Sequence, residues 1–256
     1  MTDLRTKIVC ITGASSGIGE ACARAFARAG ARLLLCARRL ERLDALVPEL
    51  RALGAPETMT FALDVRDREA VAGRFGGLPE SWQGIDILVN NAGLSRGLDT
   101  IQEGSLQDWE EMIDTNVKGL LYVSRAVLPG MVRRGSGHII NIGSIAGHEV
   151  YPKGNVYCGT KHAVGAITKG MQLDLLGTGV RASTVDPGMV ETEFSQVRFH
   201  GDQERASAVY KGLTPLSGDD VADAVLYCAT RPAHANVHEM ILMPSAQASA
   251  TMTHRA

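Results

Sequence analysis

The sequence has no long apolar run and almost no net charge, and each shortage excludes a class of protein. It lacks an uninterrupted apolar stretch of the ~18 residues that a membrane-spanning helix needs. The formal net charge of -2 gives no field that would attract nucleic acid or an anionic membrane. Residues 1–7 include polar and charged residues and lead into a strand pattern rather than into the apolar core of a signal peptide. We therefore expect a cytoplasmic protein that binds neither nucleic acid nor membrane.

Cysteine and histidine are also too sparse to predict a metal centre. The cysteines lack the close pairing of a zinc or thiol-redox motif and the density of a disulfide scaffold, so we expect reduced thiols. His234 and His238 are four residues apart, but the segment between them follows Pro232 and offers no complete ligand set. We expect no metal. The five cysteines are Cys10, Cys22, Cys36, Cys158 and Cys228.

Short apolar runs alternate with helical patterns along the chain. This alternation is typical of βαβ units, whose strands lie parallel with helices on both faces of the sheet. We expect one α/β domain over residues 1–256, a doubly wound Rossmann-type fold with a seven-stranded parallel sheet. The predicted strands are 7–12, 32–37, 58–63, 85–90, 138–142, 180–185 and 239–243.

Helix-end signals agree with this alternation. Gly30 and Gly54 stand where the first two helical patterns stop. Ser105 and Asp108 resemble a capping box at the start of a long helix, which Pro129 should bend or end. The predicted helices are 18–29, 40–53, 106–134 and 157–176.

A glycine-rich segment joins the first predicted strand to the first predicted helix. Residues 12–19 read Thr-Gly-Ala-Ser-Ser-Gly-Ile-Gly, so the backbone can approach a phosphate at the helix N-terminus. The spacing differs from the general Gly-x-Gly-x-x-Gly, and a turn without a ligand is the alternative. The position within a βαβ unit favours a pyrophosphate site. Its candidate residues are Gly13, Ser15, Ser16, Gly17, Ile18 and Gly19.

The end of the second predicted strand indicates which dinucleotide binds. Folds that select NAD place an acidic residue there for the ribose hydroxyls, but this chain has Arg38 and Arg39. Two guanidiniums suit a phosphate monoester, which predicts NADP with its 2′-phosphate at these arginines. The alternative is that both are simply the solvated start of the next helix.

A tyrosine and a lysine one helical turn apart supply candidate chemistry. Tyr157 and Lys161 should face the same way on the helix over 157–176. A nearby cation favours the phenolate, so Lys161 should bring the pKa of Tyr157 down towards the range useful for proton transfer. Ser144 closes the fifth strand at the edge where ligands of such sheets bind, and it could hold a substrate oxygen. A turn-capping role for Ser144 is the alternative.

Taken together, these motifs resemble the complete set of the short-chain dehydrogenase/reductase family, over nearly the whole chain. The resemblance implies a catalytic tetrad of Asn116, Ser144, Tyr157 and Lys161. Tyr157 would exchange a proton with the substrate oxygen, Ser144 would orient that oxygen, and Lys161 would also bind the nicotinamide ribose. Asn116 would hold a water in a proton relay. The matching motifs are 12–19, 90–93, Asn116, Ser144, Tyr157-x-x-x-Lys161 and Pro187-Gly188.

The same resemblance implies further contacts with the cofactor. Asp64 and Val65 would lie at the adenine, 91–93 beside the adenosine half, and 187–192 around the nicotinamide carboxamide. Ser16 stands where many NADP users of the family have a basic residue, so the preference for NADP depends on the two arginines. The implied contacts are Asp64, Val65, Asn91, Ala92, Gly93, Tyr157, Lys161, Pro187, Gly188, Val190 and Thr192.

Three longer stretches, 109–116, 126–132 and 193–199, resemble bacterial NADP-dependent 3-hydroxy acid dehydrogenases. This subgroup implies a homotetramer that acts on serine, allo-threonine and related 3-hydroxy acids, or reduces malonic semialdehyde. A close branch reduces sulfoacetaldehyde. An acid-bearing short substrate is the shared theme, with a neutral carbonyl compound as the alternative. A non-catalytic protein that senses NADP is an alternative of another class.

Residues 191–216 interrupt the strand and helix alternation and predict an insertion that sets substrate selectivity. An anionic substrate needs a cation, and Arg198 in this insertion is the candidate, with Lys153 and His148 behind it. Arg198 could equally form a surface ion pair or a contact between subunits. Both interpretations remain open from the sequence.

Overall fold

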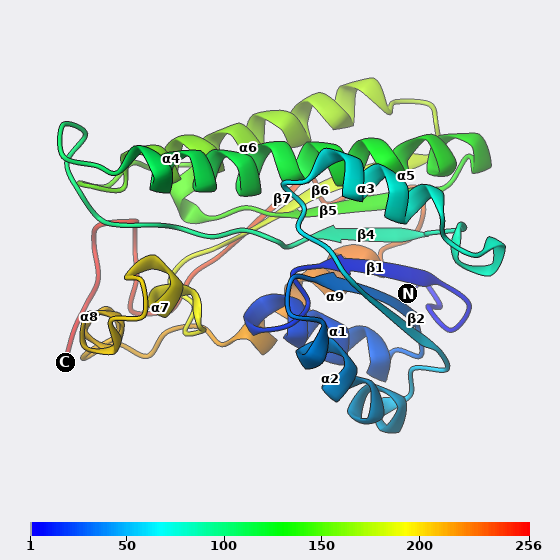
Figure 1. Cartoon of the computed structure of the whole chain (residues 1–256), viewed down its shortest axis with the longest axis horizontal. Helices are drawn as coiled ribbons and strands as arrows, with labels where there is room; N and C mark the ends of the chain where they lie inside the picture. Colours follow the sequence, from blue (N-terminus) through cyan, green and yellow to red (C-terminus); the bar gives the residue numbers. More distant parts are fainter. Residues whose placement is uncertain (1) are drawn as a thin grey trace.

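Parallel strands form the centre of the computed structural model, which describes residues 2–256 (Figure 1). All belong to one seven-stranded sheet of order β3-β2-β1-β4-β5-β6-β7, which confirms the predicted doubly wound, Rossmann-type α/β fold. The predicted ends differ by at most two residues, as at β4, predicted from 85 and observed from Ile87. The strands are β1 (Ile8–Thr12), β2 (Arg32–Ala37), β3 (Thr58–Ala62), β4 (Ile87–Asn90), β5 (Gly137–Ile142), β6 (Val180–Pro187) and β7 (Glu239–Leu242).

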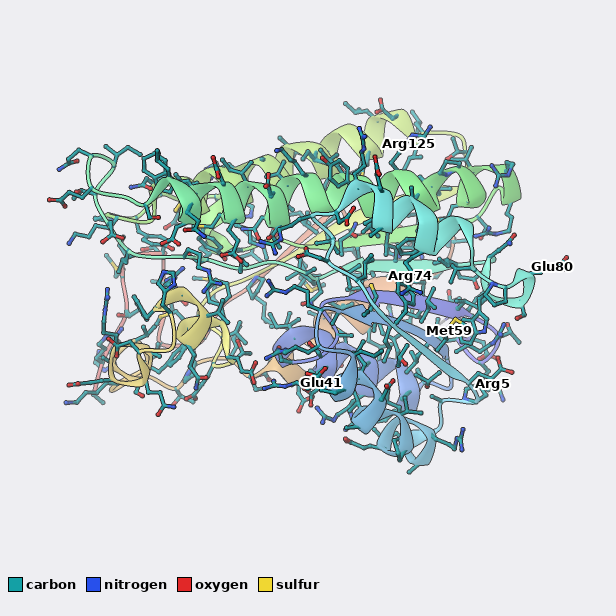
Figure 2. All side chains as sticks on the ribbon, in the orientation of Figure 1. Arg5, Glu41, Met59, Arg74, Glu80 and Arg125 are labelled. Atoms are coloured by element: carbon teal, nitrogen blue, oxygen red, sulfur yellow. The ribbon has the colours of Figure 1, made fainter. Side chains whose placement is uncertain are left out.

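Helices cover both faces of the sheet. On one face lie α1 (Gly17–Arg28), α2 (Leu40–Leu53) and α9 (Gly218–Ala229). On the other lie α3 (Arg68–Gly76), α5 (Leu120–Arg134) and α6 (Asn155–Asp174). Charged side chains such as Glu41, Glu80 and Arg125 are exposed on the outer surface (Figure 2). Among residues 2–256, no helix combines the length and the apolar character needed to cross a membrane.

Strand β1 is apolar along most of its length because both of its faces are covered. Along β1, Val9 and Ile11 point into the core beneath α1, whereas Ile8 and Cys10 point into the core beneath α5. Alternation of side chains between the two faces of a strand places them in this way. The five cysteines are buried as free thiols, as the sequence predicted.

The long helix predicted over 106–134 is interrupted. Helix α4 (Leu106–Ile113) is followed by a π-helical segment, Asp114–Gly119, and only then by α5. Pro129 lies inside α5 and does not end it. Gly119 lies so close to the segment that contains Val65 that an added Cβ would be 2.6 Å from a Val65 methyl group. Insertions of this kind widen a helix locally and often stand at functional sites.

The predicted insertion contains two short helices and contacts the C-terminal segment. Helices α7 (Phe194–Arg198) and α8 (Gln203–Ala208) lie between β6 and α9. The chain end runs beside α8 (Figure 1), where Arg255 Nη2 donates to the Val209 carbonyl at 3.0 Å and the Ala256 amide donates to Gly212 at 3.0 Å. The C-terminal segment therefore supports the insertion from within the same chain.

His138 of β5 is buried as a neutral imidazole and should make the fold sensitive to acid. Burial, helped by the Arg181 guanidinium, lowers its pKa to about 3 from 6.5, and its Nε2 lies 2.8 Å from Ser183 Oγ. As the pH falls, His138 binds a proton in the unfolded chain before it does so in the folded chain. The free energy of unfolding that the neutral imidazole provides above about pH 6.5 is therefore lost progressively towards about pH 3. From this residue we expect a loss of about 2 to 3 kcal/mol between about pH 6.5 and 4.5.

Urea unfolding of the wild type and of His138→Gln at the two pH values measures this contribution. The amide keeps a polar group opposite Ser183 but does not titrate. The variant should lose less stability on acidification than the wild type. An identical loss in the two proteins would contradict a neutral buried imidazole.

Candidate active site

A cavity of about 380 Å³ opens at the carboxyl ends of the strands. This is the edge of a doubly wound sheet at which ligands bind, next to the point where strand order reverses between β1 and β4. Most residues predicted from sequence meet there. They are Gly13, Ser15, Ser16, Gly17, Ile18, Arg38, Arg39, Asp64, Val65, Asn91, Ala92, Gly93, Ser144, Tyr157, Lys161, Pro187, Gly188, Val190, Thr192 and Arg198.

The phosphate loop leaves its backbone donors open towards the cavity. Ser16 caps α1 without a side-chain hydrogen bond to the first-turn N–H groups. Gly17 has a φ of 55°, and an added Cβ there would lie 3.2 Å from Thr192 Cβ. Asn91 Nδ2 donates to the Thr12 and Gly13 carbonyls at 2.9 and 3.1 Å, which fixes the start of the loop. The loop can therefore hold an anion and lies directly against the insertion.

Gly19 and Asn116 do not line the cavity but support its walls. A Cβ on Gly19 would lie 2.4 Å from Asn91 Nδ2, so this glycine allows the helix to pack against the loop. Asn116, in the π-helical segment, accepts from the Leu94 amide at 2.8 Å and donates to Thr160 Oγ1 at 3.0 Å. Both residues lie behind the cavity surface. The sequence had predicted that Gly19 contacts the cofactor directly.

The two arginines after β2 have different surroundings. Arg38 is more than half exposed and has a distant carboxylate neighbour, Glu111, at 3.8 Å. Arg39 Nη2 donates to Ser16 Oγ at 2.9 Å, and its Nη1 lies 3.0 Å from Glu193. Arg39 therefore brings a guanidinium to Ser16, the loop position at which many NADP users of the family have a basic residue. Arg38 is the more available of the two guanidiniums for a ligand.

Tyr157 and Lys161 are both buried in the cavity wall, but their electrostatic relation differs from the prediction. Burial raises the pKa of the Tyr157 phenol above its usual value, and the Tyr151 phenol raises it further. Arg198 and Ser144, rather than Lys161, lower it. Lys161 Nζ donates to the Ile142 carbonyl at 2.9 Å and lies 5.9 Å from the centre of the Tyr157 ring. Lys161 is therefore not among the groups that lower the pKa of Tyr157 in this structure.

Lys161 itself is strongly affected by its surroundings. Burial lowers its pKa to about 8, and the Asp186 carboxylate partly opposes this change. The ammonium is therefore charged at neutral pH but begins to lose its proton in mildly alkaline solution. Ser144 also borders the cavity, and its Oγ accepts from the Ala146 amide at 3.1 Å. The capping role and the cavity position considered for Ser144 therefore occur together.

Arg198 reaches the same ring from the insertion. Its Cζ lies 5.3 Å from the centre of the Tyr157 ring and 5.1 Å from that of Phe194. Its Nη2 donates to the Tyr151 hydroxyl at 2.9 Å. Its Nε is buried and has no hydrogen-bond partner among the described residues. A buried donor without a partner beside the Tyr157 phenol is suited to an anion.

The secondary candidates for the anion, His148 and Lys153, do not border the cavity. His148 Nε2 lies 2.9 Å from the buried Asp186 carboxylate and does not border the cavity. Lys153 is exposed and borders a separate, small depression. His148, Asp186 and Glu239 form a group whose ligand-type atoms lie within 4.8 Å of one another. Hydrogen bonding and ion pairing within the group account for its arrangement.

Sequence reasoning missed several residues that border the cavity. Tyr151 and Phe194 contact Arg198, and no sequence motif marks either of them as a site residue. Thr115 has a buried Oγ1 without a partner among residues 2–256, and its place next to Asn116 was the available signal. Gln247 accepts from the Met189 amide at 2.8 Å, and no local pattern marks this glutamine.

A phosphate-binding loop and a buried Tyr-Lys pair at one sheet edge define a nucleotide-dependent oxidoreductase. The family model described as short chain dehydrogenase matches residues 7–203, so the chain belongs to that family. The resemblance predicted from the motifs is thereby confirmed, together with the enzyme class.

Named relatives span the same length as this chain. NADP-dependent 3-hydroxy acid dehydrogenase YdfG of Salmonella typhi is 48% identical over 251 residues, which is 97% of this chain and 100% of the relative. Sulfoacetaldehyde reductase 2 of Chromohalobacter salexigens is 48% identical over 242 residues, 94% and 95% of the two chains. A solved structure of the closed form of serine dehydrogenase with NADP+ is 46% identical, with a TM-score of 0.92 over 97% of this chain and 100% of that one.

Proposed function

We propose that this protein transfers hydride between NADP(H) and a short 3-hydroxy acid or its semialdehyde, of the serine, allo-threonine or 3-hydroxypropionate/malonic semialdehyde type. The observation that carries the proposal is the unpartnered Nε of Arg198 beside the Tyr157 ring. The similar dehydrogenase from Salmonella typhi is named for NADP and 3-hydroxy acids, and the solved serine dehydrogenase holds NADP+. These names support the same cofactor and the same kind of substrate here.

The cavity fits NADP. Gly13 and Gly17 have left-handed backbone conformations at the open N-terminus of α1, which suits a pyrophosphate. Arg38 stands where a 2′-phosphate would need a guanidinium, and the buried Thr115 Oγ1 leaves a hydrogen-bonding group in the wall. When bound, NADP(H) supplies or accepts the hydride.

The chain's own residues would manage the proton and the substrate oxygen. Because burial raises its pKa, Tyr157 keeps its proton at neutral pH and can donate it to a carbonyl oxygen that gains charge. Ser144 would hold that oxygen by its hydroxyl. In the oxidative direction the phenol must first lose its proton, and the positive charge of Arg198 would favour this loss. Asn116, which donates to Thr160 Oγ1, would support the helix that carries Tyr157 and Lys161 from behind the wall.

Arg198 would bind the carboxylate of the substrate. A carboxylate one or two carbons from the reacting carbon matches a guanidinium that lies within 5.3 Å of the Tyr157 ring centre. A sulfonate is the second candidate because the relative from Chromohalobacter salexigens is named sulfoacetaldehyde reductase. A neutral carbonyl compound would leave the buried Nε without a partner.

NADPH oxidation with malonic semialdehyde, sulfoacetaldehyde and propanal tests the proposal. We expect kcat/KM to be highest for malonic semialdehyde. Arg198→Met keeps much of the side-chain volume and removes the charge, and it should lower kcat/KM for the charged aldehydes about a hundredfold by raising KM. Propanal should be affected far less. Equal losses for charged and neutral aldehydes would contradict an anion site.

We further propose one catalytic domain over residues 1–256, with 191–216 as its substrate insertion, that assembles as a homotetramer in the cytoplasm. Large apolar side chains are exposed on α4, on α5, and at and just after the end of α6, which favours association. They include Ile113, Leu121, Leu173 and Leu176. Light scattering on the purified protein should give four times the 27.3 kDa chain mass, and a monomer would contradict the proposal.

A further inference from the structure

Helix α7 brings two side chains over the Tyr157 ring, so its position determines the substrate end of the cavity. The Phe194 ring centre lies 5.7 Å from that of Tyr157, and Arg198 Cζ lies 5.3 Å away. The helix has five residues and packs chiefly on α8, which has six. Helices this short are not stable alone, so contacts from outside the insertion must hold α7 in place.

Glu193, the residue directly before α7, makes such a contact. Its carboxylate lies 2.6 Å from Arg42 Nη1 and 3.0 Å from Arg39 Nη1. Hydrogen bonds from Arg42 and Arg39 lower the pKa of Glu193, so the carboxylate is charged at neutral pH. Arg39 continues the network to Ser16 Oγ at 2.9 Å. One carboxylate thus connects α7, the start of α2 and the phosphate loop.

The neighbouring backbone brings the same segments together. Thr192 lies so close to Gly17 that an added Cβ would be 3.2 Å from its Cβ. Glu193, Arg39 and Ser16 all border the cavity. The insertion and the phosphate loop therefore meet at one point, and Glu193 supplies the charged contact there.

We propose that Glu193 is a positioning residue that latches α7, and with it Arg198, to Arg39 and Arg42. The inference rests on the proposed function, because α7 has a role in substrate binding only if Arg198 binds the carboxylate of the substrate. Each side chain of the latch is more than a third exposed, so the ion pairs are weak enough to open and close during turnover. Since the latch engages Arg39, Arg38 becomes the main guanidinium for the 2′-phosphate.

Glu193→Gln removes the charge and keeps the shape, and it tests the latch. Hydrogen exchange of the α7 amides should become about tenfold faster, in the absence as well as the presence of NADPH. The kcat/KM for malonic semialdehyde should fall about tenfold, and the Kd of NADPH should stay within about twofold. Arg42→Gln, which leaves Arg39 in place, should change the exchange and kcat/KM in the same direction by a smaller factor.

Glu49→Gln is the matched control. Glu49 pairs with Arg24 at 2.7 Å nearer the C-terminal end of α2, and neither borders the cavity. This variant should change neither exchange nor kcat/KM. Unchanged α7 exchange in Glu193→Gln would overturn the latch, and so would a loss of NADPH binding as large as the loss of activity. If the wild type turned over none of the aldehydes, the proposed function would fail, but faster α7 exchange would still support the latch.

Discussion

Tyr157→Phe should lower kcat for aldehyde reduction about a thousandfold, the size expected when a general acid is removed. The ring, which packs against Phe194 at a centre distance of 5.7 Å, is retained, so the wall of the cavity should keep its shape. The Kd of NADPH, measured by fluorescence titration, should therefore change little. A loss in kcat without a loss in cofactor binding identifies an interaction made during the reaction.

Tyr227→Phe is the control for the loss of a tyrosine hydroxyl. Tyr227 lies on α9, is 47% exposed and does not border the cavity. Its variant should have wild-type kcat and KM. If Tyr157→Phe retained more than about a tenth of wild-type kcat, the proton would have to come from another group, contrary to our proposal.

Arg38→Ala should weaken NADPH about fiftyfold and NADH hardly at all. A guanidinium that hydrogen-bonds a phosphate contributes about 1.5 to 3 kcal/mol, and NADH has no phosphate at this position. Arg38 is 54% exposed with its nearest carboxylate, on Glu111, 3.8 Å away, so its loss should leave the surrounding fold intact. Fluorescence titration with both dinucleotides measures the change in selectivity.

Arg51→Ala is the control on the same stretch of chain. Arg51 is exposed in the last turn of α2, away from the cavity, and its removal takes away one positive charge, as the removal of Arg38 does. Both dinucleotides should bind this variant as they bind the wild type. Equal weakening of NADPH and NADH by Arg38→Ala would contradict a contact with the 2′-phosphate.

The features predicted correctly from sequence are those that short segments determine. A glycine-rich turn between an apolar strand and an alanine-rich helix specifies the phosphate loop, wherever the rest of the chain lies. The strands follow from their apolar runs, and parallel strands bring their carboxyl ends, with Ser144, Pro187 and Arg38, to one edge. The family motifs then placed Tyr157 and Lys161 in the cavity wall.

The features missed depend on contacts between distant segments. Glu193 and Arg39 are 154 positions apart, and nothing near either residue indicates the pairing. His148 was considered as a secondary candidate for the anion, but Asp186 engages it from β6. The effect expected of Lys161 on Tyr157 assumed that helical spacing fixes where the ammonium points.

The break in the predicted helix over 106–134 has a similar cause. A π-helical segment costs energy locally and is retained where tertiary contacts favour it. Here Gly119 packs against Val65, and Asn116 is hydrogen-bonded to Leu94 and Thr160. Sequence periodicity alone predicts a continuous helix, because it contains none of these contacts.

Transfer of an isotope label tests the central claim most directly. NADPH carrying deuterium at either C4 position of the nicotinamide is incubated with the enzyme and malonic semialdehyde, and the product is analysed by mass spectrometry. We predict that one of the two labelled forms gives 3-hydroxypropionate with a single deuterium at the former carbonyl carbon. Product without deuterium from both forms, or no product at all, would contradict hydride transfer from NADPH to a short acidic aldehyde.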